Sequence, residues 1–324
     1  MKETYELQHR VALLNPYGSV VRVLEPSPDS ILTGIKNTAT IPNSLMHKLE
    51  KYGFGLHTID KKSQLAGRAV DTQLINPISG HVMSGSSSGT AVNVFAGIND
   101  LGIGNDGGGS VLAPAISVNI YGFISRLIEK DRVCGPLKPN TDGMTAPSSI
   151  GFMARRREIL LKAISCSIGI EAGAHCGKVL SDQKYEGLES EVVSVMDPLA
   201  PRSELVPYLR EQLSKCDVMV VTEGPIDLEG FGDSLFGHFD ERTREIQKKS
   251  CKGYVRVCNI AGATALAIPQ NGLGMAVLLM CESVPEKIAC MLEAAESFPE
   301  IHDELIERYF LNLNNYFLDE YQID

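Results

Sequence analysis

The sequence of residues 84–115 is SGSSSGTAVNVFAGINDLGIGNDGGGSVLAPA. It contains two clusters of small residues, one at 84–89 and one at 102–110, on either side of an apolar segment that predicts a buried helix. Glycine and serine at this density favour tight turns, whose main-chain N–H groups can be presented to an anion or a polar ligand. The two clusters are therefore the first place to look for a functional site.

The first cluster fits the pattern of a nucleophile elbow. Residues 85–89 match G-x-S-x-G, which requires a strand before the serine and an acid followed by a histidine further along the chain. The preceding segment 77–84 is polar and turn-like. The histidines that follow are His175, His238 and His302, and none stands in a recognisable motif. The elbow interpretation is therefore weak.

The second cluster fits a dinucleotide-binding pattern. Residues 102–107 match G-x-G-x-x-G, and Glu129 stands near the distance expected for an acid that binds ribose. However, Gly109, Ser110 and Pro114 make a poor start for the helix that would receive a pyrophosphate. This short pattern is also weak when taken alone.

Taken together, the two clusters resemble the amidase-signature family, whose pattern is roughly G-G-S-S-[GS]-G followed by D-x-G-G-S-x-x-x-P. Ser86 and Ser110 align with the two serines of that pattern without a gap between them. Residues 31–37, ILTGIKN, resemble the family's apolar strand that ends in a lysine, here Lys36. Residues 217–223 and 259–262 extend the resemblance along the chain. The chain resembles an unusually short member of this family.

The resemblance implies a triad of Lys36, Ser86 and Ser110. In this scheme Ser110 attacks the carbonyl, Ser86 passes on its proton, and Lys36 receives it. Lysine can accept a proton only when it is neutral, and burial favours the neutral form. The flanking Ile31 and Ile35 predict such burial.

The glycines before Ser110 have a separate predicted role. The N–H groups of Gly107, Gly108, Gly109 and Ser110 can face one concave site, which suits the oxyanion of a tetrahedral intermediate. Glycine is favoured there because a side chain would block the approach of a ligand. The sequence thus predicts an oxyanion hole at residues 107–109.

Some positions differ from the family pattern. Ser84 replaces the first glycine, and Leu112 stands where the family often has an arginine. Because that arginine holds a substrate carboxylate in some members, its loss argues against such a substrate. The resemblance also implies a cis peptide bond between Gly85 and Ser86, a conformation that costs about 3–4 kcal/mol outside proline.

Length and composition favour one globular domain, residues 1–324. The chain has 44% hydrophobic and 22% charged residues and a formal charge of −10, which argues against nucleic acid as a partner. No apolar run approaches the ~20 residues that span a bilayer, so no membrane association is expected. Eight scattered cysteines without a C-x-x-C pair predict free thiols, a cytoplasmic location and no metal site.

The pattern of elements predicts an α/β fold with a central mixed sheet covered by helices on both faces. The expected elements are short strands within 1–35, a helix at 43–52, a loop at 64–84, helices at 152–164 and 203–213, strands at 217–222, 263–269 and 275–280, and helices at 285–296 and 300–318. The apolar residues within 306–317 suit either the core or a homodimer contact.

The sequence therefore predicts an amidase that cuts the carbon–nitrogen bond of a small or acyl-amide substrate through an acyl-enzyme, without metal or organic cofactor. Two alternatives remain open at this level. One is an acyltransferase or amidotransferase-like subunit, and the other is a catalytically silent binding protein with the same fold. The sequence identifies no substrate-binding residue.

Overall fold

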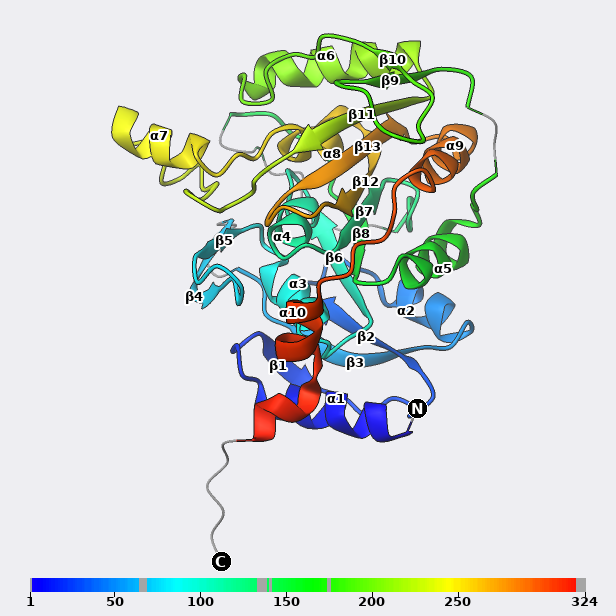
Figure 1. Ribbon diagram of the computed structural model, residues 1–324, viewed down its shortest axis with the longest axis vertical. Helices are drawn as coiled ribbons and strands as arrows, with labels where there is room; N and C mark the ends of the chain where they lie inside the picture. Colours follow the sequence, from blue (N-terminus) through cyan, green and yellow to red (C-terminus); the bar gives the residue numbers. More distant parts are fainter. Residues whose placement is uncertain (1, 64–68, 133–138, 140–141, 174–175, 319–324) are drawn as a thin grey trace, which may run out of the picture.

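The computed structural model describes residues 2–63, 69–132, 139, 142–173 and 176–318. Within them, an 11-stranded sheet crosses the molecule in the order β1-β3-β2-β6-β8-β7-β12-β13-β11-β9-β10 (Figure 1). A separate hairpin pairs β4 with β5. The strands are β1 (Val20–Val23), β2 (Ile31–Lys36), β3 (Phe54–Asp60), β4 (Val70–Ile75), β5 (Val82–Ser84), β6 (Leu101–Asp106), β7 (Tyr121–Ser125), β8 (Ser149–Ala154), β9 (Val179–Ser181), β10 (Glu191–Val192), β11 (Val218–Glu223), β12 (Ala263–Pro269) and β13 (Ala276–Glu282).

Helices cover both faces of this sheet. The helices are α1 (Lys2–Leu14), α2 (Asn43–Glu50), α3 (Ser88–Phe95), α4 (Leu112–Ser117), α5 (Arg157–Ile168), α6 (Arg202–Lys215), α7 (Glu241–Lys248), α8 (Cys258–Ala261), α9 (Pro285–Ala295) and α10 (Glu304–Ile306). Apolar residues of α3, α4, α6 and α8 join one core cluster, and those of α2, α5 and α9 join a second (Figure 1). The predicted α/β architecture, a mixed sheet between two helical layers, is confirmed.

The centre of the sheet fixes the position of the functional segments. β7, β8 and β12 are buried at every residue, as expected of strands covered on both faces. β2 lies parallel to β6, with Thr33 opposite Leu101 and Ile35 opposite Ile103. Parallel strands end at the same edge of a sheet, so Lys36 and Asp106, the last residues of β2 and β6, lie at one edge.

Two predicted elements near the N-terminus differ from the structure. Residues 2–14 form α1 rather than strand-like pieces, because Val11 and Ala12 pack against Ile98 and Leu313 from distant parts of the chain. Such partners are invisible to a local pattern and outweigh a weak local preference. Similarly, the segment predicted as a loop at 64–84 contains β4 and β5, which pair only with each other.

Boundaries also differ further along the chain. The helix predicted at 152–164 begins later, at Arg157, because residues 149–154 form β8 between β6 and β7. The helix predicted at 300–318 is divided into α10, a π-helical turn at Glu307–Leu311 and a 3₁₀ turn at Leu313–Phe317. The strands predicted at 217–222, 263–269 and 275–280 are confirmed as β11, β12 and β13.

None of the helices in the described part of the chain combines the length and the apolar character that spanning a bilayer requires. In the same residues, no group of three or more His, Cys, Asp or Glu side chains is arranged to hold a metal ion.

Candidate active site at the edge of the sheet

Lys36 lies buried at the carboxyl end of β2. Only 4% of its surface is exposed. Its Nζ donates hydrogen bonds to Ser86 Oγ at 2.6 Å and to Asn105 Oδ1 at 2.7 Å. Asn105 comes from β6, the parallel neighbour of β2. The structure therefore brings Lys36 and Ser86 into direct contact, although 50 residues separate them in the chain.

The environment of Lys36 favours its neutral form. Burial lowers the pKa of Lys36 from 10.5 to about 7, while the Asp106 carboxylate opposes this effect and Lys62 adds to it. An amine with a pKa near 7 is partly unprotonated at neutral pH and can accept a proton, which an ordinary lysine does poorly. The predicted burial of Lys36 is confirmed, and its role as a base stays a prediction.

Ser86 sits on a sharp turn that leads into α3. Gly85 has a φ of +120°, in the region that favours glycine, and a Cβ at this position would lie 2.6 Å from Pro114 Cδ. The Ser88 hydroxyl donates to the Gly85 carbonyl at 2.6 Å and closes the turn. The chain turns here with a trans peptide bond, so the expected cis bond between Gly85 and Ser86 is wrong; the cis bond among the described residues is Gly224–Pro225.

Ser110 lies on a loop whose main-chain N–H groups donate hydrogen bonds to Asp106. One carboxylate oxygen of Asp106 accepts the Gly109 N–H at 2.7 Å, and the other accepts the Val111 N–H at 2.7 Å. The Ser87 N–H donates to the Ser110 carbonyl at 3.2 Å, which joins this loop to the turn that carries Ser86. The Ser110 side chain is partly exposed and makes no hydrogen bond within the described residues.

The predicted oxyanion donors differ in availability. The Gly109 N–H is already donated to Asp106, and Gly109 has a φ of +96° that the loop requires. Among the described residues, the N–H groups of Gly107, Gly108 and Ser110 have no acceptor. Gly107 is exposed and Gly108 is half-buried, so the N–H groups of both residues are accessible to a ligand. The oxyanion prediction therefore depends on Gly107, Gly108 and Ser110.

Asn105 and Asn259 support the site in ways that the motifs did not indicate. Asn105 accepts from Lys36, but an asparagine before Asp106 carries no signal in the sequence. Asn259 belongs to a segment that resembles the family. Its Nδ2 donates to the Gly107 and Pro147 carbonyls at 3.3 and 3.0 Å, and thereby holds the glycine loop.

Asp227 anchors the other side of the serine turn. Its Oδ2 accepts the Ser84 N–H and its Oδ1 accepts the Ser84 Oγ, both at 2.5 Å. The Ser84 hydroxyl in turn accepts the Gly232 N–H at 2.6 Å. Ser84, which replaces a glycine of the family pattern, therefore has a structural partner 143 residues away.

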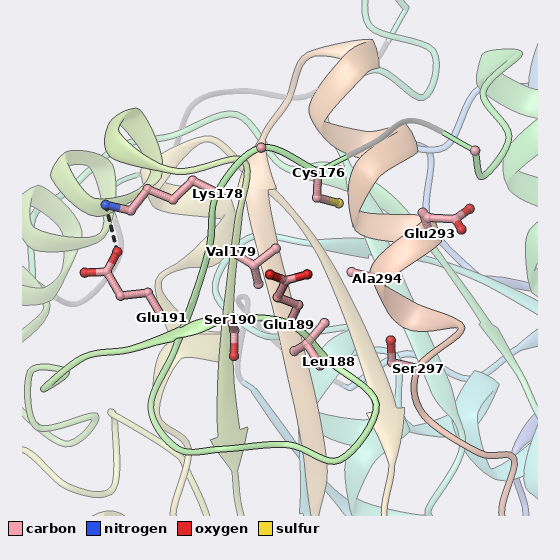
Figure 2. Close-up of a pocket in the computed structure, with 12 residues that line it drawn as sticks. Cys176, Lys178, Val179, Leu188, Glu189, Ser190, Glu191, Glu293, Ala294 and Ser297 are labelled. Carbon is pink, nitrogen blue, oxygen red and sulfur yellow. Dashed lines mark ion pairs between the residues drawn. The ribbon is translucent and has the colours of Figure 1, made fainter.

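A cavity with a sizeable volume lies away from these residues. It has a volume of about 930 Å³ and is bordered by the segments around Cys176 and Glu189 and by α9 (Figure 2). Its charged side chains include Lys178 and Glu191, which form an ion pair at 3.1 Å with both partners about half exposed. None of the predicted site residues lines this cavity, so its size does not locate the chemistry.

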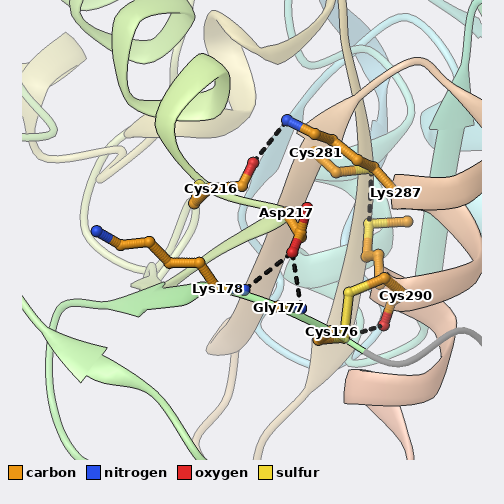
Figure 3. Close-up of a disulfide and its surroundings, with 9 residues drawn as sticks. Cys176, Gly177, Lys178, Cys216, Asp217, Cys281, Lys287 and Cys290 are labelled. Atoms are coloured by element: carbon orange, nitrogen blue, oxygen red, sulfur yellow. Dashed lines mark hydrogen bonds between the residues drawn. A yellow bond between two sulfur atoms is a disulfide. The ribbon is translucent and has the colours of Figure 1, made fainter.

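One wall of this cavity carries a disulfide, which corrects the expectation of free thiols. Cys176 is bonded to Cys290 of α9 (Figure 3). The two cysteines lie 114 residues apart, so no spacing motif could have paired them. The other described cysteines are free, namely Cys166, Cys216, Cys251, Cys258 and Cys281. The predicted cytoplasmic location was based on free thiols throughout and loses that support.

Comparisons with known proteins identify similar sequences and similar folds. A model of the Amidase family matches residues 72–183, which include both serine clusters. No curated protein matches the sequence. Similar solved structures include an amidase with 15% identity and a TM-score of 0.63, covering 90% of this chain and 94% of that one. Another is a component of the glutamyl-tRNA(Gln) amidotransferase from Thermotoga maritima, with 14% identity and a TM-score of 0.62, in which 91% of this chain and 92% of that chain are covered.

A third structure, of 6-aminohexanoate cyclic dimer hydrolase complexed with substrate, has 13% identity and a TM-score of 0.61, with 92% of this chain and 94% of that chain covered. At these identities the structural matches show a shared fold. The chain therefore resembles the Amidase family over residues 72–183, which include both serine clusters, and it shares the fold of these solved structures over 90% or more of its length.

Proposed function

We propose that the protein is an amide hydrolase that uses Lys36, Ser86 and Ser110. The observation that carries the proposal is the 2.6 Å hydrogen bond between Lys36 Nζ and Ser86 Oγ, made by an amine whose pKa burial lowers to about 7. A serine nucleophile needs a base, and in this proposal Lys36 serves Ser110 through Ser86, the hydroxyl that Lys36 contacts.

The proposed reaction proceeds through an acyl-enzyme. Ser110 Oγ attacks the amide carbonyl while its proton passes to Ser86, and the Ser86 proton passes to neutral Lys36. The N–H groups of Gly107 and Gly108 stabilise the oxyanion. The protonated Lys36 then returns a proton through Ser86 to the leaving amine. Water then attacks the acyl carbonyl and loses a proton to Lys36 along the same path, and Lys36 returns that proton through Ser86 to Ser110 Oγ as the carboxylic acid leaves.

Ser110 suits the role of nucleophile better than Ser86. The Ser110 side chain is partly exposed and has no hydrogen-bond partner among the described residues, so a substrate can approach it. Ser86 instead accepts from Lys36 and follows the buried Gly85. The Ser87 N–H donates to the Ser110 carbonyl and joins the two serine segments, so we expect Ser86 to act as the proton relay between Lys36 and Ser110.

A fluorophosphonate probe tests the proposal directly. The wild-type chain at pH 8 is expected to be labelled, and the label is expected to be lost in Ser110→Ala. Turnover of a panel of simple amides should be lost in the same variant. Ser117→Ala is a matched control, because Ser117 is a buried serine of α4 whose hydroxyl only bonds the Pro114 carbonyl.

Each alternative gives a different result. A folded wild-type chain that is neither labelled nor active would support a silent binding protein. Labelling with turnover that rises strongly when hydroxylamine is added would support an acyltransferase. Labelling that persists in Ser110→Ala would remove Ser110 from the mechanism.

A further inference from the structure

Lys252 lies against the loop that carries the predicted nucleophile. A Cβ placed on Gly109 would be 3.5 Å from Lys252 Cε and 3.2 Å from the Val255 carbonyl oxygen. A Cβ on Gly108 would be 3.4 Å from the Arg256 carbonyl oxygen. The segment 252–256 therefore forms one side of the glycine loop. The Lys252 amine is bonded to Cε, the atom that lies beside Gly109. Gly109 is the residue that precedes Ser110 in the chain.

Lys252 is buried, yet its amine has no partner. Only 8% of its surface is exposed. Within the described residues, its Nζ takes part in no hydrogen bond and no ion pair. The unpartnered amine is not fully buried, so part of its surface remains accessible. An ammonium group with three unused donors in a buried place needs an acceptor, which a ligand can supply.

The two carboxylates that act electrostatically on Lys252, Asp227 and Asp106, already accept hydrogen bonds from other groups. Asp227 uses both oxygens on Ser84, and Asp106 uses both on the amides of its own loop. Burial, followed by Arg202 and Arg256, lowers the pKa of Lys252, while Asp227 and Asp106 act in the opposite direction. An anion bound at the amine would offset the cost of burying the charge.

We propose that Lys252 binds a carboxylate of the amide substrate and thereby selects anionic amides. This inference rests on the proposed function, since it names the substrate class of the same site. It also revises an expectation from the sequence: Leu112 removes the arginine that holds a carboxylate in some family members, and Lys252 supplies a cation from a different segment. The competing explanation is that Lys252 only balances the charge of Asp227.

Matched pairs of substrates test the proposal on the full chain. Succinamic acid is compared with pentanamide, and N-acetylglycine with N-propylacetamide, so that a carboxylate is present or absent on the acyl side or the amine side. Wild type is expected to favour the acid of one pair in kcat/KM by about 10-fold or more, the range of a hydrogen bond to a charged group. Lys252→Met should remove that preference by raising KM for the acid, and Lys252→Arg should keep part of it.

The controls separate selectivity from folding. Lys248→Met removes a lysine from the exposed helix α7 and should leave the preference unchanged. Thermal unfolding shows whether Lys252→Met is folded, and the selectivity of the wild type tests the proposal even if that variant is not. No preference for either acid in an active wild type would overturn the inference, as would Lys252→Met slowing acid and neutral amide by the same factor.

Failure of the proposed function looks different. If no amide is cleaved and no probe binds Ser110, binding of succinate is measured by calorimetry. Succinate that binds to wild type and not to Lys252→Met would support the anion site without hydrolysis. Equal binding to both proteins, or binding to neither, would overturn it.

Discussion

Replacing Lys36 by methionine is expected to abolish turnover and to stabilise the fold at neutral pH. Burial lowers the pKa of this lysine from 10.5 to about 7. At about 1.4 kcal/mol for each pKa unit, keeping the lysine buried costs about 5 kcal/mol at pH 7 or below. Methionine avoids this cost but leaves Ser86 Oγ and Asn105 Oδ1 without a donor, at about 1 kcal/mol each because both residues are partly exposed. The net expectation is a gain of about 3 kcal/mol in unfolding free energy.

The gain should depend on pH with a definite sign. Between about pH 7 and 10.5 the unfolded chain still holds the proton that folded Lys36 has lost. Because the unfolded state then binds more protons, the stability of the wild type rises with pH across this window. The advantage of Lys36→Met should therefore shrink by about 1.4 kcal/mol per pH unit above pH 7 and reach zero near pH ~9.

Urea unfolding followed by circular dichroism at pH 6, 7, 8 and 9 measures this difference. Groups other than Lys36 titrate in both proteins and cancel in the comparison. Lys248→Met, at an exposed position, should show a small difference from wild type that does not vary in this way. A Lys36→Met protein that is less stable than wild type at pH 7, or a difference independent of pH, would refute the reasoning.

Three further outcomes are expected. The pH profile of kcat/KM should rise up to about pH 7 and then level off, because Lys36 must be neutral to act; a flat profile from pH ~5.5 to ~8.5 would contradict this. Asp106→Asn should lower the unfolding free energy by about 2–4 kcal/mol, measured with urea, because one amide end cannot accept a main-chain N–H. Gly109→Ala should cost about 1–3 kcal/mol, since its φ is +96° and a Cβ would crowd the Val255 carbonyl, whereas Gly107→Ala, in open space, should cost less in the same thermal unfolding experiment.

Local patterns in the sequence were sufficient for much of the fold. Apolar runs predicted β11, β12 and β13, because strands covered on both faces are apolar along their whole length. The amphipathic pattern predicted α6 and α9 within a few residues. The spacing of the two serine clusters indicated the resemblance to the Amidase family, and the apolar residues before Lys36 indicated the burial of the lysine.

Local patterns failed where partners lie far away in the chain. Helix α1 depends on Ile98 and Leu313, which pack against it from distant positions in the chain. The same limit applies to the site. No sequence pattern distinguishes Asn105 from other residues beside Asp106. The parallel pairing of β2 with β6 brings the Asn105 side-chain amide into contact with Lys36.

The sequence alone determined which residue types are present at the edge of the sheet: a lysine after an apolar strand, two serines on glycine turns, and an aspartate that can hold one of those turns. Only the tertiary structure decided which groups meet. In the tertiary structure Lys36 donates a hydrogen bond to Ser86, and Asp106 accepts the Gly109 N–H. Asp227 accepts a hydrogen bond from Ser84, and Lys252 lies beside the glycine loop. These contacts join residues separated by as many as 143 positions, and the packing of the whole sheet, rather than any local spacing, brings them together.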